Sequence, residues 1–482
     1  MDAKQESLAF DMAVRALQRG DHTEAVSLFR KAAELGHIQA QYQMGEAYYY
    51  GQGVGKDYAE ATRWYFLSAT QGYADAQCDI AFCYERGLGG KANPEEAVKW
   101  YRKAADQGLA RAQYLLALCY SRGVGVKANP EEALHWFRKA ADQGVAKAQH
   151  QIGECYYFGK AVEKDYAEAV KWYLLSAEQG CADAQCDLAF CYERGYGVKQ
   201  NIEEAVKWYQ KAADQGLARA QYFLGICYKK GIGVQVNLNE AVKWFRKSAE
   251  QGLSRAQYQM GECYYFGQAV EKDYAEAARW YLKSAEQGYA DAQYDLALLY
   301  ERGLGVVANL EEAVKWYQKA ADQGLARAQF NLGICIEKGL GVKAHPEEAV
   351  KWYRKAADQG HAKAQGKLGY CYAQGIGVKS NAQEAVQWYQ KSAEQGDKTA
   401  QYNLACRYYS GAGIEKDYVA AVKYFRPLAE QGDSDAQYFL GLCYLDGLGV
   451  TRDLPKAIAL FKKSAAQGKA LSKKILVLIG EE

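Results

Sequence analysis

Apolar residues recur along the chain at helical spacing, in pairs of segments joined by glycine-containing turns. From Ala74 to Arg86 the apolar positions, Ile80 and Cys83 among them, form one stripe at a spacing of about 3.6 residues. A second stripe, which includes Trp100 and Tyr101, follows a few residues later. This alternation predicts two antiparallel helices in each unit, packed against each other through their apolar stripes.

The pair of segments repeats with a fixed period, because a glycine recurs at the same place every 36 residues. A period of this length, without insertions or deletions, is typical of a stacked helical array. We predict an atypical N-terminal capping repeat over residues 1–36 and a C-terminal capping helix over residues 469–482, hence thirteen helix pairs and one further helix. The twelve repeats between them are residues 37–72, 73–108, 109–144, 145–180, 181–216, 217–252, 253–288, 289–324, 325–360, 361–396, 397–432 and 433–468.

Each predicted second helix begins with a capping signal. In one repeat Asn93 can cap the helix, Pro94 stands at its first position and Glu96 completes a capping box. Eleven of the twelve repeats carry Asn or Asp at this cap, and His345 is the exception. The first helix ends at a glycine such as Gly87, which permits the positive φ that a reversing chain needs. The ends of both helices are therefore encoded locally.

One column of small residues and one proline add detail to this pattern. The position of Ala81 is always Gly or Ala in the other repeats, which predicts the close approach of a neighbouring helix. The pattern loosens after residue 364, and the repeat over residues 397–432 carries Pro427 inside its second helix. An interior proline removes a helix hydrogen bond and clashes with the preceding turn, so we predict a kink between Tyr424 and Pro427.

Composition and charge narrow the function classes. The chain has 60 basic and 58 acidic residues, a net charge of +2, which is no electrostatic footprint for nucleic acid. The N-terminus shows no basic-then-apolar signal region, and no apolar run has the length of a membrane span. We therefore expect a cytoplasmic protein without a membrane span; export by a route that needs no signal sequence stays open.

The repeat pattern resembles a known family. The consensus is A-x-A-Q-Y-x-L-G-x-x-Y-x-x-G-x-G-V-x-x-D-x-x-E-A-V-x-W-Y-x-K-A-A-E-Q-G, which looks like the Sel-one-like repeat, a relative of the tetratricopeptide repeat with a longer turn inside the unit. The resemblance covers nearly the whole chain. It implies an all-α, right-handed superhelical solenoid of 36-residue helix-turn-helix repeats, of a kind that mostly serves as an adaptor or scaffold for other proteins.

The cysteines and histidines give no sign of a metal, a cofactor or a catalytic site. Nine of the thirteen cysteines form one column on the buried stripe of the first helix, where we expect reduced, structural thiols. The six histidines show no pair at ligand spacing on one helix. Cysteine-rich members of the resembled family carry a disulfide at the positions of Ala105 and Gln113, which is therefore absent here. This weakens one alternative, a penicillin-binding, β-lactamase-like hydrolase of that branch.

A second period of 108 residues, or three repeats, lies above the first. By the resemblance, the first helices line the concave side, and the exposed positions are those of Tyr42, Glu46, Tyr49 and Tyr50. Along the array these positions alternate in three steps: acidic and aromatic, apolar with a charge pair, then apolar and basic. The candidate partner-binding residues are Glu46, Tyr50, Phe82, Arg86, Leu118, Arg122, Glu154, Phe158, Phe190, Arg194, Ile226, Lys230, Glu262, Phe266, Leu298 and Arg302.

Aromatic residues and arginine are the types enriched at protein interfaces, so this surface favours protein partners. Recent duplication would preserve the same pattern without any function, and this second interpretation stays open. The sequence as a whole predicts a non-enzymatic scaffold or adaptor for protein–protein interaction. The alternatives are the hydrolase named above and an RNA-binding helical repeat, which would need a basic groove.

Overall fold

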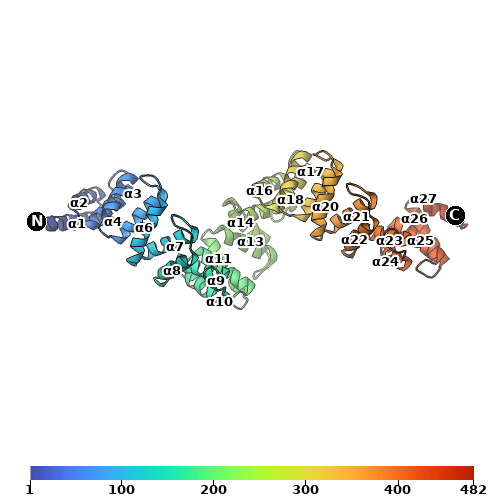
Figure 1. Ribbon diagram of the computed structural model, residues 1–482, viewed down its shortest axis with the longest axis horizontal. Helices are drawn as coiled ribbons and strands as arrows, with labels where there is room; N and C mark the ends of the chain where they lie inside the picture. The colour runs from blue at the N-terminus through green and yellow to red at the C-terminus, as the bar shows by residue number, and fades with distance from the viewer. Residues whose placement is uncertain (1, 482) are drawn as a thin grey trace. The chain divides into compact units, whose positions relative to one another are not determined.

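The computed structural model describes residues 2–481, and every element assigned in that range is a helix (Figure 1). The predicted thirteen helix pairs and one further helix are confirmed. The helices are α1 (Asp2–Gln18), α2 (His22–Glu34), α3 (Ile38–Tyr50), α4 (Tyr58–Thr70), α5 (Ala74–Arg86), α6 (Pro94–Asp106), α7 (Ala110–Arg122), α8 (Pro130–Asp142), α9 (Ala146–Phe158), α10 (Tyr166–Glu178), α11 (Ala182–Arg194), α12 (Ile202–Asp214), α13 (Ala218–Lys230), α14 (Leu238–Glu250), α15 (Ser254–Phe266), α16 (Tyr274–Glu286), α17 (Ala290–Arg302), α18 (Leu310–Asp322), α19 (Ala326–Lys338), α20 (Pro346–Asp358), α21 (Ala362–Gln374), α22 (Ala382–Glu394), α23 (Lys398–Ser410), α24 (Tyr418–Glu430), α25 (Ser434–Asp446), α26 (Leu454–Ala466) and α27 (Ala470–Leu478).

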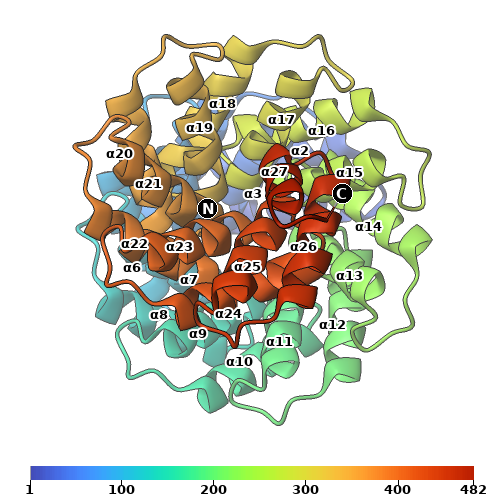
Figure 2. The ribbon, with the colours of Figure 1, turned by 90° about the vertical axis from the view of Figure 1, so that its right-hand side faces the viewer.

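The chain forms two compact units, which divide within α14 after residue 244. Within each unit, consecutive helices pack against each other in chain order (Figure 1). Figure 2 shows this order most clearly for the second unit, from α15 to α27. The core of each unit is built from the Ala, Tyr and Trp columns of successive repeats, with buried rings such as Tyr101 and Tyr353. Between residues 2 and 481 no helix is long and apolar enough to cross a membrane.

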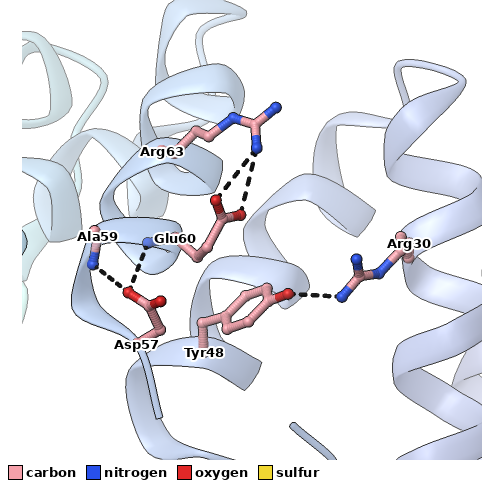
Figure 3. Close-up of polar contacts among 6 residues, drawn as sticks. All are labelled: Arg30, Tyr48, Asp57, Ala59, Glu60 and Arg63. Atoms are coloured by element: carbon pink, nitrogen blue, oxygen red, sulfur yellow. Dashed lines mark hydrogen bonds and ion pairs between the residues drawn. The ribbon is translucent and has the colours of Figure 1, made fainter. Parts of the chain in front are cut away.

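The second helices begin at the predicted caps. The Asp57 carboxylate accepts hydrogen bonds from the backbone N–H groups of Ala59 and Glu60, at 2.9 and 3.1 Å (Figure 3). His345, the exception in sequence, takes the same role, because its Nδ1 accepts from the N–H of Glu348 at 3.2 Å. A cap at this position satisfies one of the N–H groups that the first turn of a helix leaves without a partner.

The two glycines of the turn have different tasks. Gly87 ends α5 in the left-handed region, with φ of 68°. Gly89 also has a positive φ, and a Cβ there would lie 2.4 Å from the carbonyl oxygen of Tyr58, at the start of the preceding second helix. The second glycine therefore lets the turn pack on the previous repeat. Ala161 and Ala269 replace it in two repeats and keep the positive φ, at 60° and 56°.

The column of small residues lies where the two helices of one repeat touch. A Cβ on Gly45 would lie 2.4 Å from Cδ1 of Tyr65, the aromatic residue of the second helix that faces it. Gly153 and Gly261 meet Tyr173 and Tyr281 in the same way, at 2.5 and 2.4 Å. The predicted close approach of a neighbouring helix is confirmed, and its cause is a buried tyrosine ring.

A buried glutamine ties each repeat to the one before it. The side-chain amide of Gln77 donates to the carbonyl oxygen of Ala69, near the end of α4, at 3.1 Å. Its own oxygen accepts from Nε2 of Gln107, just after α6, at 2.7 Å. One side chain on α5 thus connects α4 and α6. The glutamines that donate in this way to an alanine carbonyl are Gln41, Gln77, Gln113, Gln149, Gln185, Gln221, Gln257, Gln293, Gln329, Gln365, Gln401 and Gln437.

A second polar contact joins some neighbouring repeats nearer the surface. The guanidinium of Arg30 on α2 donates to the hydroxyl oxygen of Tyr48 on α3 at 2.6 Å (Figure 3). Arg138 on α8 reaches Tyr156 on α9 in the same manner, at 2.9 Å. These contacts are exposed to solvent, so we assign them less weight than the buried glutamines.

The repeat with the interior proline keeps its helix. Helix α24 runs from Tyr418 to Glu430 through Pro427 without interruption and has the length of the other second helices. Asp417 still caps it, since its carboxylate accepts from the N–H of Ala420 at 2.9 Å. Pro427 is exposed and has no N–H to donate to the carbonyl of Lys423.

We predict that the last repeats open before the rest of the second unit. Replacing Pro427 by Lys restores a donor in α24 and should raise the local stability by about 1–3 kcal/mol. Native-state hydrogen exchange should show residues 397–482 exchanging before residues 245–396, with the difference reduced in the variant. Uniform protection across residue 397, or no gain from the substitution, would contradict this prediction.

Candidate functional site

The sixteen candidate residues, here called the first-helix face, all reach the surface. They stand at two positions of each first helix, four residues apart, which places them on the same side. In the last turn of each helix the residue is exposed, as are Tyr50, Arg86 and Arg122. The residue four positions earlier, such as Phe82 or Leu118, is half-buried. None of the sixteen belongs to the buried core.

The structure brings six of these residues together around Phe82. A hollow of about 120 Å³ lies on one side of the ring, between α3, α5 and α7. A second hollow, of about 80 Å³, lies on the other side and is also lined by this ring. The first-helix face contributes Glu46, Tyr50 and Phe82 to the first hollow, and Phe82, Arg86, Leu118 and Arg122 to the second.

The second hollow presents positive charge. Within the described residues, neither Arg86 nor Arg122 forms an ion pair, and the guanidinium of Arg86 lies over the ring of Phe82 at 5.7 Å. The only carboxylate that lines this hollow, Glu85, accepts a hydrogen bond from the hydroxyl of Tyr101 at 2.9 Å. The two guanidinium groups are therefore available to an external anion, beside the apolar surface of Phe82.

The first hollow contains a buried carboxylate that sequence analysis did not identify. Asp79 is 8% exposed; its carboxylate accepts from the hydroxyl of Tyr42 at 3.1 Å and pairs with the guanidinium of Arg111 at 2.8 Å. These three side chains come from the first helices of three successive repeats. Burial raises the pKa of Asp79 from its ordinary value, and the positive charge of Arg111 opposes this rise.

The same cluster recurs 108 residues further on. Asp187 contacts Nε2 of His150 and the guanidinium of Arg219, both at 2.8 Å. His150 here takes the place of Tyr42, and it is 9% exposed.

A third copy follows with a changed arginine contact. Asp295 accepts from the hydroxyl of Tyr258 at 2.9 Å, whereas Arg327 donates to Asp291 at 2.6 Å. Burial raises the pKa of Asp295 to about 6, against the opposing effects of Arg327 and of the Tyr258 hydroxyl. The sequence signal for all three clusters was an aspartate that recurs every 108 residues in a column otherwise occupied by Gln, Leu, Phe or Asn in these repeats.

The cysteines lie as their column predicts. All thirteen are unpaired, and most are buried. Burial raises the pKa of Cys83 to about 11 and that of Cys119 to about 12, so both remain protonated and weakly nucleophilic at neutral pH. Among the described residues, no group of three His, Cys, Asp or Glu side chains could hold a metal ion.

At the positions where the cysteine-rich branch would carry a disulfide, the chain has a hydrogen bond. Nε2 of Gln113 donates to the carbonyl oxygen of Ala105 at 3.2 Å. The same two positions thus connect neighbouring repeats by a different interaction.

Tandem helix pairs, each tied to the preceding one by a buried glutamine, define an all-α helical-repeat solenoid. The profile of the Sel1 repeat matches the chain thirteen times, and the chain belongs to the Sel1 repeat family. The matches cover residues 10–37, 38–73, 74–109, 110–145, 146–181, 182–217, 218–253, 254–289, 290–325, 326–361, 362–397, 398–433 and 434–469. The pair α1 and α2, predicted as an atypical cap, contains the first of these matches.

Solved structures agree with this assignment. A protective antigen of uropathogenic Escherichia coli, which has the SLR fold, is 37% identical, with a TM-score of 0.72 over 95% of this chain and 98% of the other. A Sel1 repeat protein from Oxalobacter formigenes is 36% identical, with a TM-score of 0.50 over 63% of this chain and 87% of the other. No protein of curated function matches the sequence.

The raised pKa of Asp295 predicts an unusual pH dependence. A free aspartate titrates near about 3.9, so the folded state keeps this proton to a higher pH than the unfolded state does. Its contribution to stability is present below that value and is lost as the pH rises through about 6. Thermal unfolding at pH 4.5 and 7 should therefore show Asp295→Asn gaining stability relative to the natural protein as the pH rises. Parallel pH profiles would show that the carboxyl is not perturbed.

Proposed function

We propose that the chain is a non-enzymatic scaffold that binds a protein partner along the first-helix face. The observation that carries the proposal is the pair of hollows on either side of Phe82, in which an exposed ring is combined with two unpaired guanidinium groups. Membership of the Sel1 repeat family supports it, because such repeats typically mediate protein binding.

The residue types fit a binding surface. Aromatic side chains and arginine contribute most of the energy at protein interfaces, in particular where they are clustered and partly shielded from water. Tyr50 is 60% exposed beside the half-buried Phe82, although a large exposed ring gains nothing from water. A partner that covers these rings would remove apolar area from water and leave the charged groups at the rim.

The face is dispensable for the stack. The contacts between repeats are made by the buried glutamine, alanine, tyrosine and tryptophan columns, none of which contributes to the first-helix face. The second copy of the central step keeps the same geometry, with the guanidinium of Arg194 over the ring of Phe190 at 5.6 Å. We therefore interpret the 108-residue pattern as a repeated binding surface rather than as a relic of duplication alone.

The chemistry of the thiols supports the non-enzymatic part of the proposal. A nucleophilic cysteine needs a lowered pKa and access to substrate. The pKa values of Cys83, Cys119 and Cys191 are instead raised, because each thiol is buried.

We predict that Phe82→Ala and Phe190→Ala each weaken partner binding by about 1–3 kcal/mol, a factor of roughly 5 to 150 in Kd, since both rings are exposed anchors. The partner is first identified by affinity capture and mass spectrometry, and binding is then measured by calorimetry. Phe66→Ala is the matched control, because this ring is 41% exposed but lies on the second helix α4.

Unchanged melting temperatures are expected for all three variants, to within a few degrees. The proposal is wrong if the Phe66 variant weakens binding as much as the Phe82 variant. It is equally wrong if the loss of affinity only follows a loss of stability, because the two rings would then belong to the core.

A further inference from the structure

One column of the first helices loses its side chain in a single repeat. In the twelve regular repeats this position is occupied by Tyr42, Cys78, Tyr114, His150, Cys186, Tyr222, Tyr258, Tyr294, Phe330, Gly366, Tyr402 and Tyr438. Gly366 lies inside α21, where a glycine weakens the helix relative to alanine. Its φ is not positive, so no turn requires it.

The missing side chain leaves a hollow in the second unit. Its volume is about 420 Å³, larger than that of either hollow beside Phe82, and it lies over Gly366 between residues of α19, α21 and α23. This is within the range of pockets that bind small organic groups, roughly 300–1,000 Å³. A Cβ on Gly366 would meet only Oγ of Ser392 within 3.1 Å, so the space above the glycine is not filled by the helix packing.

The column shows what kind of group fits this position. In neighbouring repeats it holds an aromatic ring that packs on the tyrosine of the second helix. Tyr258 lies 5.6 Å from Tyr281, and Tyr294 lies 5.7 Å from Tyr317. Repeat 361–396 has the equivalent second-helix residue, Tyr389, but no ring of its own at the first-helix position.

The walls of the hollow are aromatic. Phe330 lies on one side, where its ring is 5.1 Å from that of His361. Tyr370 lies on another side and is 41% exposed. An aromatic group that enters the hollow would meet ring faces and edges, which favour tilted or offset stacking.

The charge at the rim is positive. Lys363 is exposed and forms no ion pair within the described part of the chain. The second lysine, Lys367, is neutralised by Glu337 at 2.9 Å. The carboxylate of Asp397 is engaged as the cap of α23, where it accepts from the N–H of Ala400 at 2.8 Å. The free charge of the rim is therefore that of Lys363, and it complements an acidic group.

We infer that this hollow receives an aromatic side chain of a partner protein, from a segment with an acidic residue next to the ring. The ring takes the place that a tyrosine of the chain itself has in the neighbouring repeats, and the acidic residue pairs with Lys363. The inference rests on the proposed protein-binding function, but it uses no residue of the first-helix face. The two sites can therefore fail independently.

The test uses three capped tripeptides, with the sequences Glu-Tyr-Glu, Glu-Ala-Glu and Lys-Tyr-Lys, and saturation-transfer NMR on the full chain. The first should bind, with the largest transfer on its ring protons, and the other two more weakly. Gly366→Tyr fills the hollow and should weaken the first peptide at least about tenfold. Gly366→Ala is the matched control: it removes the glycine but keeps the hollow, and its affinity should stay within about twofold of the natural protein.

Lys363→Glu provides a second variant that does not alter the core. It should weaken Glu-Tyr-Glu and strengthen Lys-Tyr-Lys, each by a few-fold, at an unchanged melting temperature. The inference is overturned if Glu-Tyr-Glu does not bind, if Glu-Ala-Glu binds as well, or if Gly366→Tyr folds and retains the affinity. Should Gly366→Tyr fail to fold, an unchanged peptide preference in Lys363→Glu overturns it by itself. None of these outcomes depends on Phe82, whose variants test the first-helix face separately.

Discussion

The stack depends on one buried amide. A side-chain amide in the core is costly unless its donors and its acceptor are satisfied. The glutamine of each first helix meets this condition with an alanine carbonyl eight residues earlier and, in most repeats, a second glutamine thirty residues later. These partners lie on the helices before and after it, so the amide fixes the distance between repeats. An insertion or deletion between them would break the contact, which accounts for the unbroken 36-residue period.

This arrangement separates support from recognition. The buried columns hold consecutive helices together, while the outward positions of the first helices carry no part of that load and are free to vary. The chain varies them in two ways. Glu46, Phe82 and Arg122 belong to a pattern that recurs every three repeats, whereas Gly366 occurs once and opens a hollow in a single repeat. A repeated surface suits an extended partner, and a unique hollow suits one particular side chain of that partner.

Most of the fold could be predicted from the sequence because its signals are local. Caps such as Asp57, turn glycines such as Gly87 and the small column at Gly45 act within one repeat. The clusters around Asp79 could not be predicted in this way, since Tyr42 and Arg111 belong to the repeats before and after it. The predicted kink at Pro427 rested on a local rule, and α24 nevertheless continues through the proline without a break.

The central claim is that the buried glutamines hold the repeats together and that the first-helix face does not. Native-state hydrogen exchange of α6 and α7 tests it directly, in Gln113→Met and in the double variant Arg86→Ala/Arg122→Ala. The Met side chain has a similar volume but leaves the carbonyl of Ala105 without its donor, which should reduce local protection by about 1–3 kcal/mol. The double variant should leave protection unchanged. Equal protection in Gln113→Met and the natural protein, or a loss in the arginine variant, would contradict the account.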